Sequence, residues 1–517
     1  MSDKFTQWFE SAKAFTHPRV VTMLFYGFSA GIPILLIFSS LSLWLREAGL
    51  ERSAVTYFSW AALGYSFKFV WAPLVDRISI PLLTQKLGRR RSWILFSQLL
   101  IMAAIAMMAL SNPTNGTNAL TIMALGAVFL GFSSATQDIV IDAYRIESAG
   151  SDLQAMMSSS YIAGYRIGMI TAGAGALYLA QTLGSSMESY SYAAWKWTYL
   201  IVALTMSVGI VTTLMIQEPE GNQRQSSDLS TQEMIRFLVM FAACVGAFIA
   251  IFVLTKTITS DYTNKLQDLL GNQSLASFLV ELVRLALTFT ATYLVAKILM
   301  TVKVVEKQVF HETYIAPVKD FFVRYRLQGP WFLLLLIAFY RISDIVLGVI
   351  ANVFYQDMGF SKIEIAAISK TFGLIMTISG GFLGGILTIR MGVLRVLLLG
   401  AVLSAATNLL YMGLSYMGHA PNMLIAVIVA DNLAAGLSLA AYIAFLSALT
   451  NIKFTAMQYA IFSSIMTLFP KIIGGYSGSM VDAVGYPTFF LLTAIMGIPV
   501  IALIIKAKNK VELDVSQ

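Results

Sequence analysis

TIMALGAVFLGFSSATQDIVIDAYR, residues 121–145, is a mostly apolar stretch in which two aspartates stand four positions apart. A helix of roughly 20 apolar residues crosses a ~30 Å hydrocarbon core, so this stretch has the length of a membrane span. An ionisable side chain at the centre of such a span costs about 2.5–3.5 kcal/mol, and each one therefore needs a partner or a function. The stretch predicts a membrane helix with carboxylates that serve a function.

Comparable apolar runs recur from one end of the chain to the other. Of the 517 residues, 57% are hydrophobic and only 12% are charged, whereas soluble domains carry about 25% charged residues. The sequence lacks the alternating segments of about ten residues that form membrane β-barrels. We therefore predict an all-α integral membrane protein. The main predicted spans are 19–46, 53–76, 92–111, 118–145, 154–183, 194–216, 331–355, 361–389, 393–416, 422–449, 454–482 and 486–507.

The segment between the two sets of six spans contains two further apolar runs, at 237–257 and 276–300. We interpret them as an added membrane hairpin, which brings the total to about 14 membrane helices. Glu281 and Arg284 weaken the second run, and an amphipathic pair lying on the membrane surface remains the alternative. The predicted parts are an N-terminal six-helix bundle, a linker with the hairpin and a C-terminal six-helix bundle, at 1–216, 217–330 and 331–517.

The net charge of +8 does not indicate nucleic-acid binding, because the basic residues lie in short loops between apolar runs. With a cytoplasmic N-terminus, 22 of the 35 Lys and Arg residues fall on the cytoplasmic side and six fall outside. This asymmetry predicts that both termini are cytoplasmic. The polar segment before the first span does not resemble a signal peptide. With only Cys244 and three dispersed histidines, we expect no disulfide, metal site or cofactor.

The two sets of six spans resemble each other weakly. A shift of 301 residues lays Ala155-Met156 on Ala456-Met457, and a shift of 310 lays Gly49-Leu50 on Gly359-Phe360. Two parallel six-helix halves joined by a cytoplasmic segment are similar to the major facilitator superfamily, in which the substrate site lies between the halves at mid-membrane.

Asp138 and Asp142 on the fourth span are four residues apart and therefore share one helix face. Burial and like charge both disfavour ionisation, so the pair suits the binding and release of protons. We predict that both acids couple transport to protons. The alternative is that Asp142 pairs with Arg145 and anchors the helix end. When the halves are aligned, Gly436 and Ala440 lie opposite the acids, so the scaffold does not require carboxylates there.

The second span carries a stripe of Tyr57, Trp60, Lys68 and Trp71. A lone lysine in an apolar span faces a cavity, forms an ion pair or extends to the interface. Aromatic rings beside a cation suit a sugar that carries an anionic group, so we predict that these four residues contact the substrate. Core packing explains the rings equally well.

Other polar residues are weaker candidates for substrate contacts. Arg166 on the fifth span could bind an anion or neutralise an acid, although the glycines around it are typical of close helix packing. Arg341 and Asp344 are three residues apart and could satisfy each other. Asp431 on the tenth span, next to Asn432, is a plausible cavity-facing acid. We include Arg166, Asp344 and Asp431 among the predicted substrate contacts.

The loop after the second span pairs an acid with a basic run. Asp76 precedes Arg89, Arg90 and Arg91, with a lengthened loop between them. We predict that Asp76, Arg89 and Arg90, with Arg145, form a cytoplasmic gate whose charge pairs hold one state of the carrier. Anchoring by positive charge alone would explain the arginines but not Asp76.

Three strings resemble the AmpG muropeptide permease family: KFVWAPLVDR at 68–77, GRRR at 88–91 and ATQDIVIDAYR at 135–145. The resemblance covers both six-helix halves and the hairpin. It implies a proton-driven importer of anhydro-muropeptides (GlcNAc-anhydro-MurNAc peptides) across the inner membrane of a Gram-negative bacterium. Such import serves peptidoglycan recycling and, in some bacteria, β-lactamase induction and thus antibiotic resistance.

By residue, the resemblance implies functional roles for Gln137, Asp138 and Asp142 and supports one for Lys68. The fourth-span string is shared in part with acetyl-CoA transporters, so a carrier of another bulky anion, such as an acyl-CoA, remains the alternative. The extramembrane loops are short and poor in acids, so we do not expect an enzyme. The expected partners are the muropeptide, protons and membrane lipid, and we expect a monomer that works by alternating access.

Overall fold

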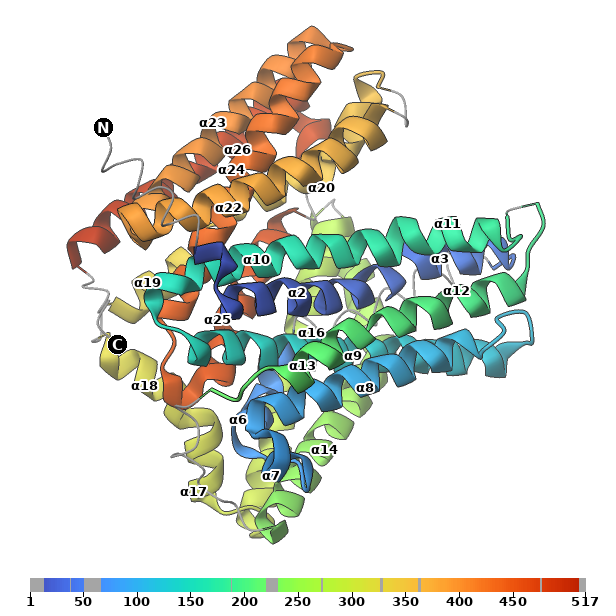
Figure 1. The fold of residues 1–517 in the computed structure, drawn as a ribbon, viewed down its shortest axis with the longest axis vertical. Helices are drawn as coiled ribbons and strands as arrows, with labels where there is room; N and C mark the ends of the chain where they lie inside the picture. The colour runs from blue at the N-terminus through green and yellow to red at the C-terminus, as the bar shows by residue number, and fades with distance from the viewer. Residues whose placement is uncertain are drawn as a thin grey trace. The chain divides into compact units, whose positions relative to one another are not determined.

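The computed structural model describes residues 14–37, 39–50, 67–186, 188–219, 231–270, 273–325, 329–360, 364–474 and 477–510. All regular structure within these residues is helical (Figure 1). The chain forms two compact units, and the first combines Met1–Gln225 with Phe321–Gln517. The second unit is Ser226–Asp320.

The first part of the larger unit contains the helices that precede the linker. They are η1 (Ala14–Thr16), α2 (Pro18–Ile37), α3 (Ser39–Glu47), η3 (Lys68–Val70), α6 (Ala72–Arg77), α7 (Leu83–Leu87), α8 (Arg89–Ala109), α9 (Thr117–Ser148), α10 (Ser151–Ile170), η4 (Thr171–Gly175), α11 (Ala176–Thr182), α12 (Tyr192–Thr205) and α13 (Ser207–Met215). Most of the predicted second span lies outside the described residues, because 51–66 are not described.

The second part of the larger unit follows the linker. Its helices are α18 (Ala316–Arg324), α19 (Gly329–Phe339), α20 (Ile342–Asp357), η7 (Ile365–Phe372), α22 (Gly373–Met391), α23 (Val393–Met417), α24 (Pro421–Ala448), η8 (Ile452–Phe454), α25 (Thr455–Gly474) and α26 (Ser477–Lys510). The predicted span 331–355 is divided, because α19 ends at Phe339 and α20 begins at Ile342. The part before the linker is the N-half of this unit, and the part after the linker is the C-half.

The smaller unit is a helical hairpin with short additions. It consists of α14 (Thr231–Leu254), α15 (Lys256–Leu270), α16 (Gln273–Thr301), α17 (Lys307–Phe310) and η6 (His311–Ile315), and α18 begins within it. Arg284 of α16 is buried, and its Nε donates to the Thr255 hydroxyl at 3.2 Å. A hydrogen bond within the hairpin thus offsets part of the cost of this charge in an apolar run.

Nine helices within the described residues are long and apolar enough to cross a membrane. In the smaller unit the apolar stretches Ile235–Ile251 and Ala286–Thr301 are shorter. The total of 14 membrane helices therefore stays a prediction.

The internal repeat appears in the way equivalent helices end. Gly49 follows α3 with φ of +83°, and Gly359 follows α20 with φ of +86°. In both places the next residue, Leu50 or Phe360, donates its amide to a carbonyl five residues earlier at 3.0 Å. These left-handed glycine termini are the same capping motif, at the pair of positions that the 310-residue shift superimposes.

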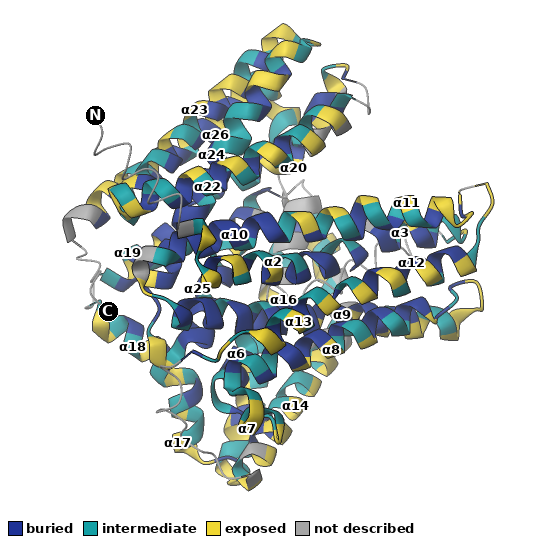
Figure 2. Ribbon diagram, in the orientation of Figure 1, coloured by how far each residue is buried: buried dark blue, intermediate teal, exposed yellow. Residues whose placement is uncertain are grey.

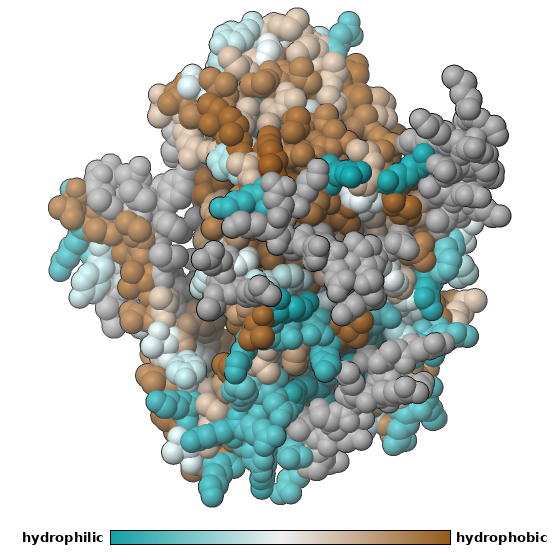
Figure 3. Space-filling model, turned by 90° about the vertical axis from the view of Figure 1, so that its left-hand side faces the viewer, coloured by the Kyte–Doolittle hydropathy of each residue, from teal (hydrophilic) through white to brown (hydrophobic). Residues whose placement is uncertain are grey.

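Each half has its own apolar core. Large buried side chains of the N-half gather among α2, α3, α8, α9 and α12, and those of the C-half among α19, α20, α23, α24 and α26 (Figure 2). Apolar side chains also face outward, as Leu409 and Ile498 do at 47% and 58% exposure. The upper part of Figure 3, where α23 and α26 lie, is accordingly rich in apolar atoms. Such a surface suits contact with lipid.

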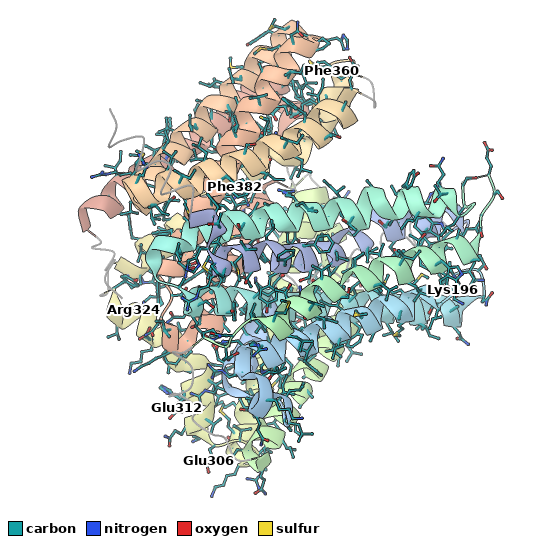
Figure 4. The ribbon with its side chains drawn as sticks, viewed as in Figure 1. Lys196, Glu306, Glu312, Arg324, Phe360 and Phe382 are labelled. Atoms are coloured by element: carbon teal, nitrogen blue, oxygen red, sulfur yellow. The ribbon has the colours of Figure 1, made fainter. Side chains whose placement is uncertain are left out.

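The halves meet through α10, which packs on α22 and α24, and through α25, which packs on α9 and α6. The Ser159 hydroxyl donates to the Gly381 carbonyl at 2.6 Å. The ring of Phe15 meets the ring of Phe382 edge to face at 4.7 Å, and Phe382 is labelled in Figure 4. Within the N-half, a Cβ at Gly164 would meet the Leu24 carbonyl at 1.9 Å. Close packing of α10 on α2 therefore requires this glycine, which fixes the position of nearby Arg166.

Candidate functional site

The two acids of α9 lie in a buried charge cluster with Lys68. The Lys68 ammonium is 3.9 Å from Asp142 Oδ2, and its charge also acts on Asp138. Asp138 Oδ1 accepts a hydrogen bond from the Tyr161 hydroxyl at 3.3 Å. Lys68 is only 8% exposed, so it neither extends to the interface nor stands alone. The structure brings together three of the predicted residues from η3 and α9.

Arg145 extends this cluster to the C-half. Its Nη2 is 3.4 Å from Asp142 Oδ1, one turn earlier on α9. Its Nη1 donates to Ser447 of α24 at 2.7 Å, and its guanidinium lies 5.2 Å from the ring centre of Tyr459 in α25. Gln154 Oε1 accepts a further bond at 2.9 Å. Arg145 therefore does more than anchor a helix end, because it connects Asp142 to the opposite half.

The predicted gate residues form a second buried network. Arg90, which is fully buried, binds Asp76 Oδ1 at 2.8 Å and both carboxylate oxygens of Glu147 at 2.5 and 2.9 Å. Arg89 donates to the backbone carbonyl of Asp76 at 2.5 Å. Two-pronged contacts between arginine and carboxylate are strong and directional. The three helices α6, α8 and α9 are thus joined at one end of the N-half.

Asp76 also reaches across to the C-half. Its carboxylate accepts the backbone amides of Ala456 and Met457 at 3.3 and 3.1 Å, in the first turn of α25. The first amides of a helix lack partners within it, and the positive end of the helix dipole attracts a carboxylate. Asp76 therefore caps a helix of one half while it is held by Arg90 of the other.

Glu218 holds the start of α8 in place. Its two carboxylate oxygens accept the backbone amides of Arg90 and Arg91 at 2.7 and 3.0 Å. Burial raises the pKa of Glu218, although the two amides and the charge of Arg90 favour the ionised form. Glu218 therefore caps the start of α8, where Arg90 and Arg91 lie.

A cavity of about 330 Å³ lies at the boundary between the halves. Arg166 of α10 lines it from the N-half, whereas Arg341, Asp344, Asp431, Tyr355 and ten further residues line it from the C-half. Three residues predicted as substrate contacts, Arg166, Asp344 and Asp431, thus meet at one cavity. Its mixture of cations, carboxylates and aromatic rings can bind a polar ligand with charged groups.

Hydroxyl groups surround the acids of this cavity. Asp344 Oδ1 accepts from Ser404, and Asp431 accepts from Thr407 and Tyr411, each at 3.3 Å. No ion pair joins Arg341 to Asp344 among the described residues, although the charge of Arg341 acts on this carboxylate, so the spacing brings the two charges near each other without a direct contact. Asn432 also lines the cavity, and its side-chain oxygen accepts a hydrogen bond from the Thr377 hydroxyl at 2.8 Å.

Two further predicted substrate contacts, Trp71 and Gln137, do not line that cavity. Trp71 is 7% exposed, and its indole N–H donates to Thr136 of α9 at 3.0 Å, so its ring packs between helices. Gln137 is fully buried, and neither atom of its amide has a hydrogen-bond partner in the described part of the chain. Tyr57 and Trp60 lie outside the described residues. No group of three or more His, Cys, Asp or Glu in the described residues could hold a metal.

Several contributors were not predicted from the sequence. Glu147 binds Arg90 from 57 positions away, and Ser447 binds Arg145 from 302 positions away. Glu218 and Tyr161 also take part. Of these residues, Glu147 could most readily have been predicted from the sequence, because it stands two residues beyond Arg145 at the end of a span that already carries two acids.

Comparison with known proteins gives the family. The family model described as Major Facilitator Superfamily matches residues 20–311 and 333–514. The chain is 29% identical over 502 residues to a Rickettsia felis protein that bears the name AmpG 4, covering 97% of this chain and 99% of the relative. It is 27% identical over 501 residues to the anhydromuropeptide permease of Escherichia coli K12, covering 97% of this chain and 82% of the relative. The resemblance to AmpG proteins is thus confirmed.

Solved structures show the same fold. The proton:xylose symporter XylE, bound to 6-bromo-6-deoxy-D-glucose, gives a TM-score of 0.56 at 12% identity, over 99% of this chain and 98% of that chain. The human organic anion transporter MFSD10 gives 0.54 at 12% identity, over 94% and 99%. The predicted fold is confirmed, and this chain belongs to the major facilitator superfamily as a multi-pass inner-membrane transporter rather than an enzyme.

Proposed function

We propose that the protein imports anhydro-muropeptides from the periplasm into the cytoplasm, with protons as the driving ion, for peptidoglycan recycling. The proposal keeps both termini in the cytoplasm and the division into two six-helix bundles at 1–216 and 331–517. Similarity along nearly the whole chain to an anhydromuropeptide permease supports this cargo and does not favour an acyl-CoA. The observation that carries proton coupling is the buried cluster of Lys68, Asp138, Asp142 and Arg145, which reaches the opposite half.

The two acids divide the work in this mechanism. Asp142 has two cationic neighbours, Lys68 and Arg145, whereas the direct contact of Asp138 is a neutral hydroxyl from Tyr161. A buried carboxylate beside a neutral donor exchanges a proton more readily than one held between two cations. Asp138 therefore takes up the proton, which frees Lys68 to bind Asp142 more closely. The ion pair between Asp142 and Arg145 then weakens, and with it the hydrogen bond from Arg145 to Ser447.

The arrangement of the halves fits a carrier open to the periplasm. Lys196, which the charge distribution assigns to the outside, and Phe360 lie at ends of the two halves that stand apart in Figure 4. Arg324, assigned to the cytoplasmic side, and Phe382 lie toward the opposite end. The Asp76 cap on α25 and the Arg145–Ser447 bond would then close the cytoplasmic side until cargo and proton are bound.

The test is uptake of radiolabelled anhydro-muropeptide into membrane vesicles with an imposed proton gradient. Wild-type vesicles should accumulate the cargo, and a protonophore should abolish accumulation. An excess of acetyl-CoA should not compete, whereas unlabelled muropeptide should. Accumulation that survives the protonophore would refute proton coupling, and competition by acetyl-CoA alone would refute the cargo.

A further inference from the structure

Two arginines from opposite halves line the cavity, and neither forms an ion pair with an acid in the described part of the chain, although the charge of Arg341 acts on Asp344. The Arg166 guanidinium donates to the sulfur of Met169 at 3.8 Å, and a thioether is a weak acceptor. In the described part of the chain, the guanidinium of Arg341 makes neither a hydrogen bond nor an ion pair. Each guanidinium carries five N–H donors. Both side chains therefore have strong donors available for a ligand in the cavity.

The acids of the cavity are stabilised in another way. Asp344 is held by Ser404, and Asp431 by Thr407 and Tyr411, through hydroxyl donors. Neither carboxylate forms an ion pair with an arginine among the described residues. All three hydroxyl partners belong to α23, so both carboxylates are held by the C-half itself. The two arginines therefore keep donors that can bind a ligand in the cavity.

Arg341 also occupies an unusual backbone position. It lies in the two-residue break between α19 and α20, directly before the first residue of α20. Interrupted helices at the centre of carriers expose free backbone amides and the positive end of a helix dipole toward anionic groups. Arg166 and Arg341 line the same cavity from opposite halves, and the charge of Arg341 acts on Arg166.

We propose that Arg166 and Arg341 form a clamp that binds one carboxylate of the cargo between the two halves, and that filling the clamp draws the halves together. The proposal rests on the proposed function for the identity of the cargo. Planar guanidinium groups bind carboxylates in two-pronged geometry. In the empty carrier the two cations repel, which favours separation of the halves. A carboxylate bound between the two guanidinium groups attracts both of them and offsets their mutual repulsion. Binding therefore promotes closure of the halves over the cargo.

The experiment measures binding to the purified full-length protein in lipid nanodiscs by calorimetry. The probes are anhydro-muropeptide, its carboxyl-amidated derivative and acetyl-CoA. The variants are Arg166→Gln, Arg341→Gln and the double variant, and the matched control is Arg395→Gln, which changes an exposed arginine at the start of α23. Arg341→Lys keeps the charge and replaces Arg341→Gln if that protein does not fold.

We expect each single Gln variant to weaken binding of the free-acid cargo by about 10- to 100-fold. The double variant should lose little more, because both arginines hold the same group. Wild-type protein should bind the amidated cargo as weakly as the variants bind the acid, and Arg395→Gln should match wild type. Arg341→Lys should fall between wild type and Arg341→Gln.

Two results from the variants would overturn the clamp: unchanged affinity in the single variants, or equal loss for the acid and the amide. Binding of acetyl-CoA but not muropeptide, with loss in either arginine variant, would keep the clamp and refute the proposed cargo. Wild-type protein that binds none of the three probes would overturn the clamp.

Discussion

The two halves of this transporter treat buried charge differently. In the N-half, apart from Arg166, buried charges gather in ion-paired networks, as Lys68 and Arg145 do with Asp142 and Arg90 does with Asp76 and Glu147. In the C-half the acids Asp344 and Asp431 are held by hydroxyls. A network in which every charge is paired with another protein group rearranges only when one group gains or loses a proton or when a helix moves. A cavity with unsatisfied donors can change when a ligand enters. The difference suggests that the N-half supplies coupling and gating, and the C-half most of the cargo site.

The largest effect should follow from breaking the gate network. Replacing Arg90 by Gln leaves two buried carboxylates without their cation, and breaking a buried ion pair in this way costs about 3–5 kcal/mol. We expect a large fall in thermal stability and loss of uptake. Arg395→Gln, at an exposed site, should change neither, and equal stability of the two variants would contradict the account.

A smaller effect should follow at the bond that links the halves. Ser447→Ala removes an acceptor for Arg145, and a hydrogen bond to a charged group contributes about 1.5–3 kcal/mol. The cytoplasmic side should open more often. Labelling of a cysteine introduced at Ser159, in a Cys244→Ser background, would report this as faster modification. A labelling rate equal to that of the background protein would show that the bond does not hold the gate closed.

Trp71 offers a smaller and more selective test. Trp71→Phe keeps a ring but loses the N–H bond to Thr136, which is worth about 1 kcal/mol. If the ring packs between helices, stability should fall by about that amount while KM for the cargo stays constant. A raised KM at unchanged stability would instead restore Trp71 as a sugar contact.

The smallest effect concerns pH. Because burial raises the pKa of Glu218 above its usual value, the native state holds this proton more tightly than the unfolded state does. The contribution of Glu218 to stability should therefore be fully present below the ordinary carboxyl pKa and decline as pH rises through the raised value. Glu218→Gln should flatten the pH dependence of the melting temperature across that window. An identical slope in both proteins would contradict the raised pKa.

Sequence patterns predicted the spans, the repeat and the residues that bear charge, because hydropathy and the cost of buried charge act locally along the chain. They could not predict partners that only folding brings together, such as Ser447 for Arg145 or Glu147 for Arg90. The break between α19 and α20, which consists of Tyr340 and Arg341, contains neither glycine nor proline and thus gives no local signal. The spacing of residues along the helix also could not show whether Trp71 contacts the substrate or packs between helices.

The most direct test of the account compares two kinds of transport by Asp138→Asn in vesicles. If Asp138 carries the driving proton, the variant should bind and exchange anhydro-muropeptide across the membrane at rates close to wild type. It should fail, however, to accumulate the cargo against its gradient when a pH difference is imposed. Accumulation at wild-type levels by a variant that cannot take up this proton would contradict the central claim.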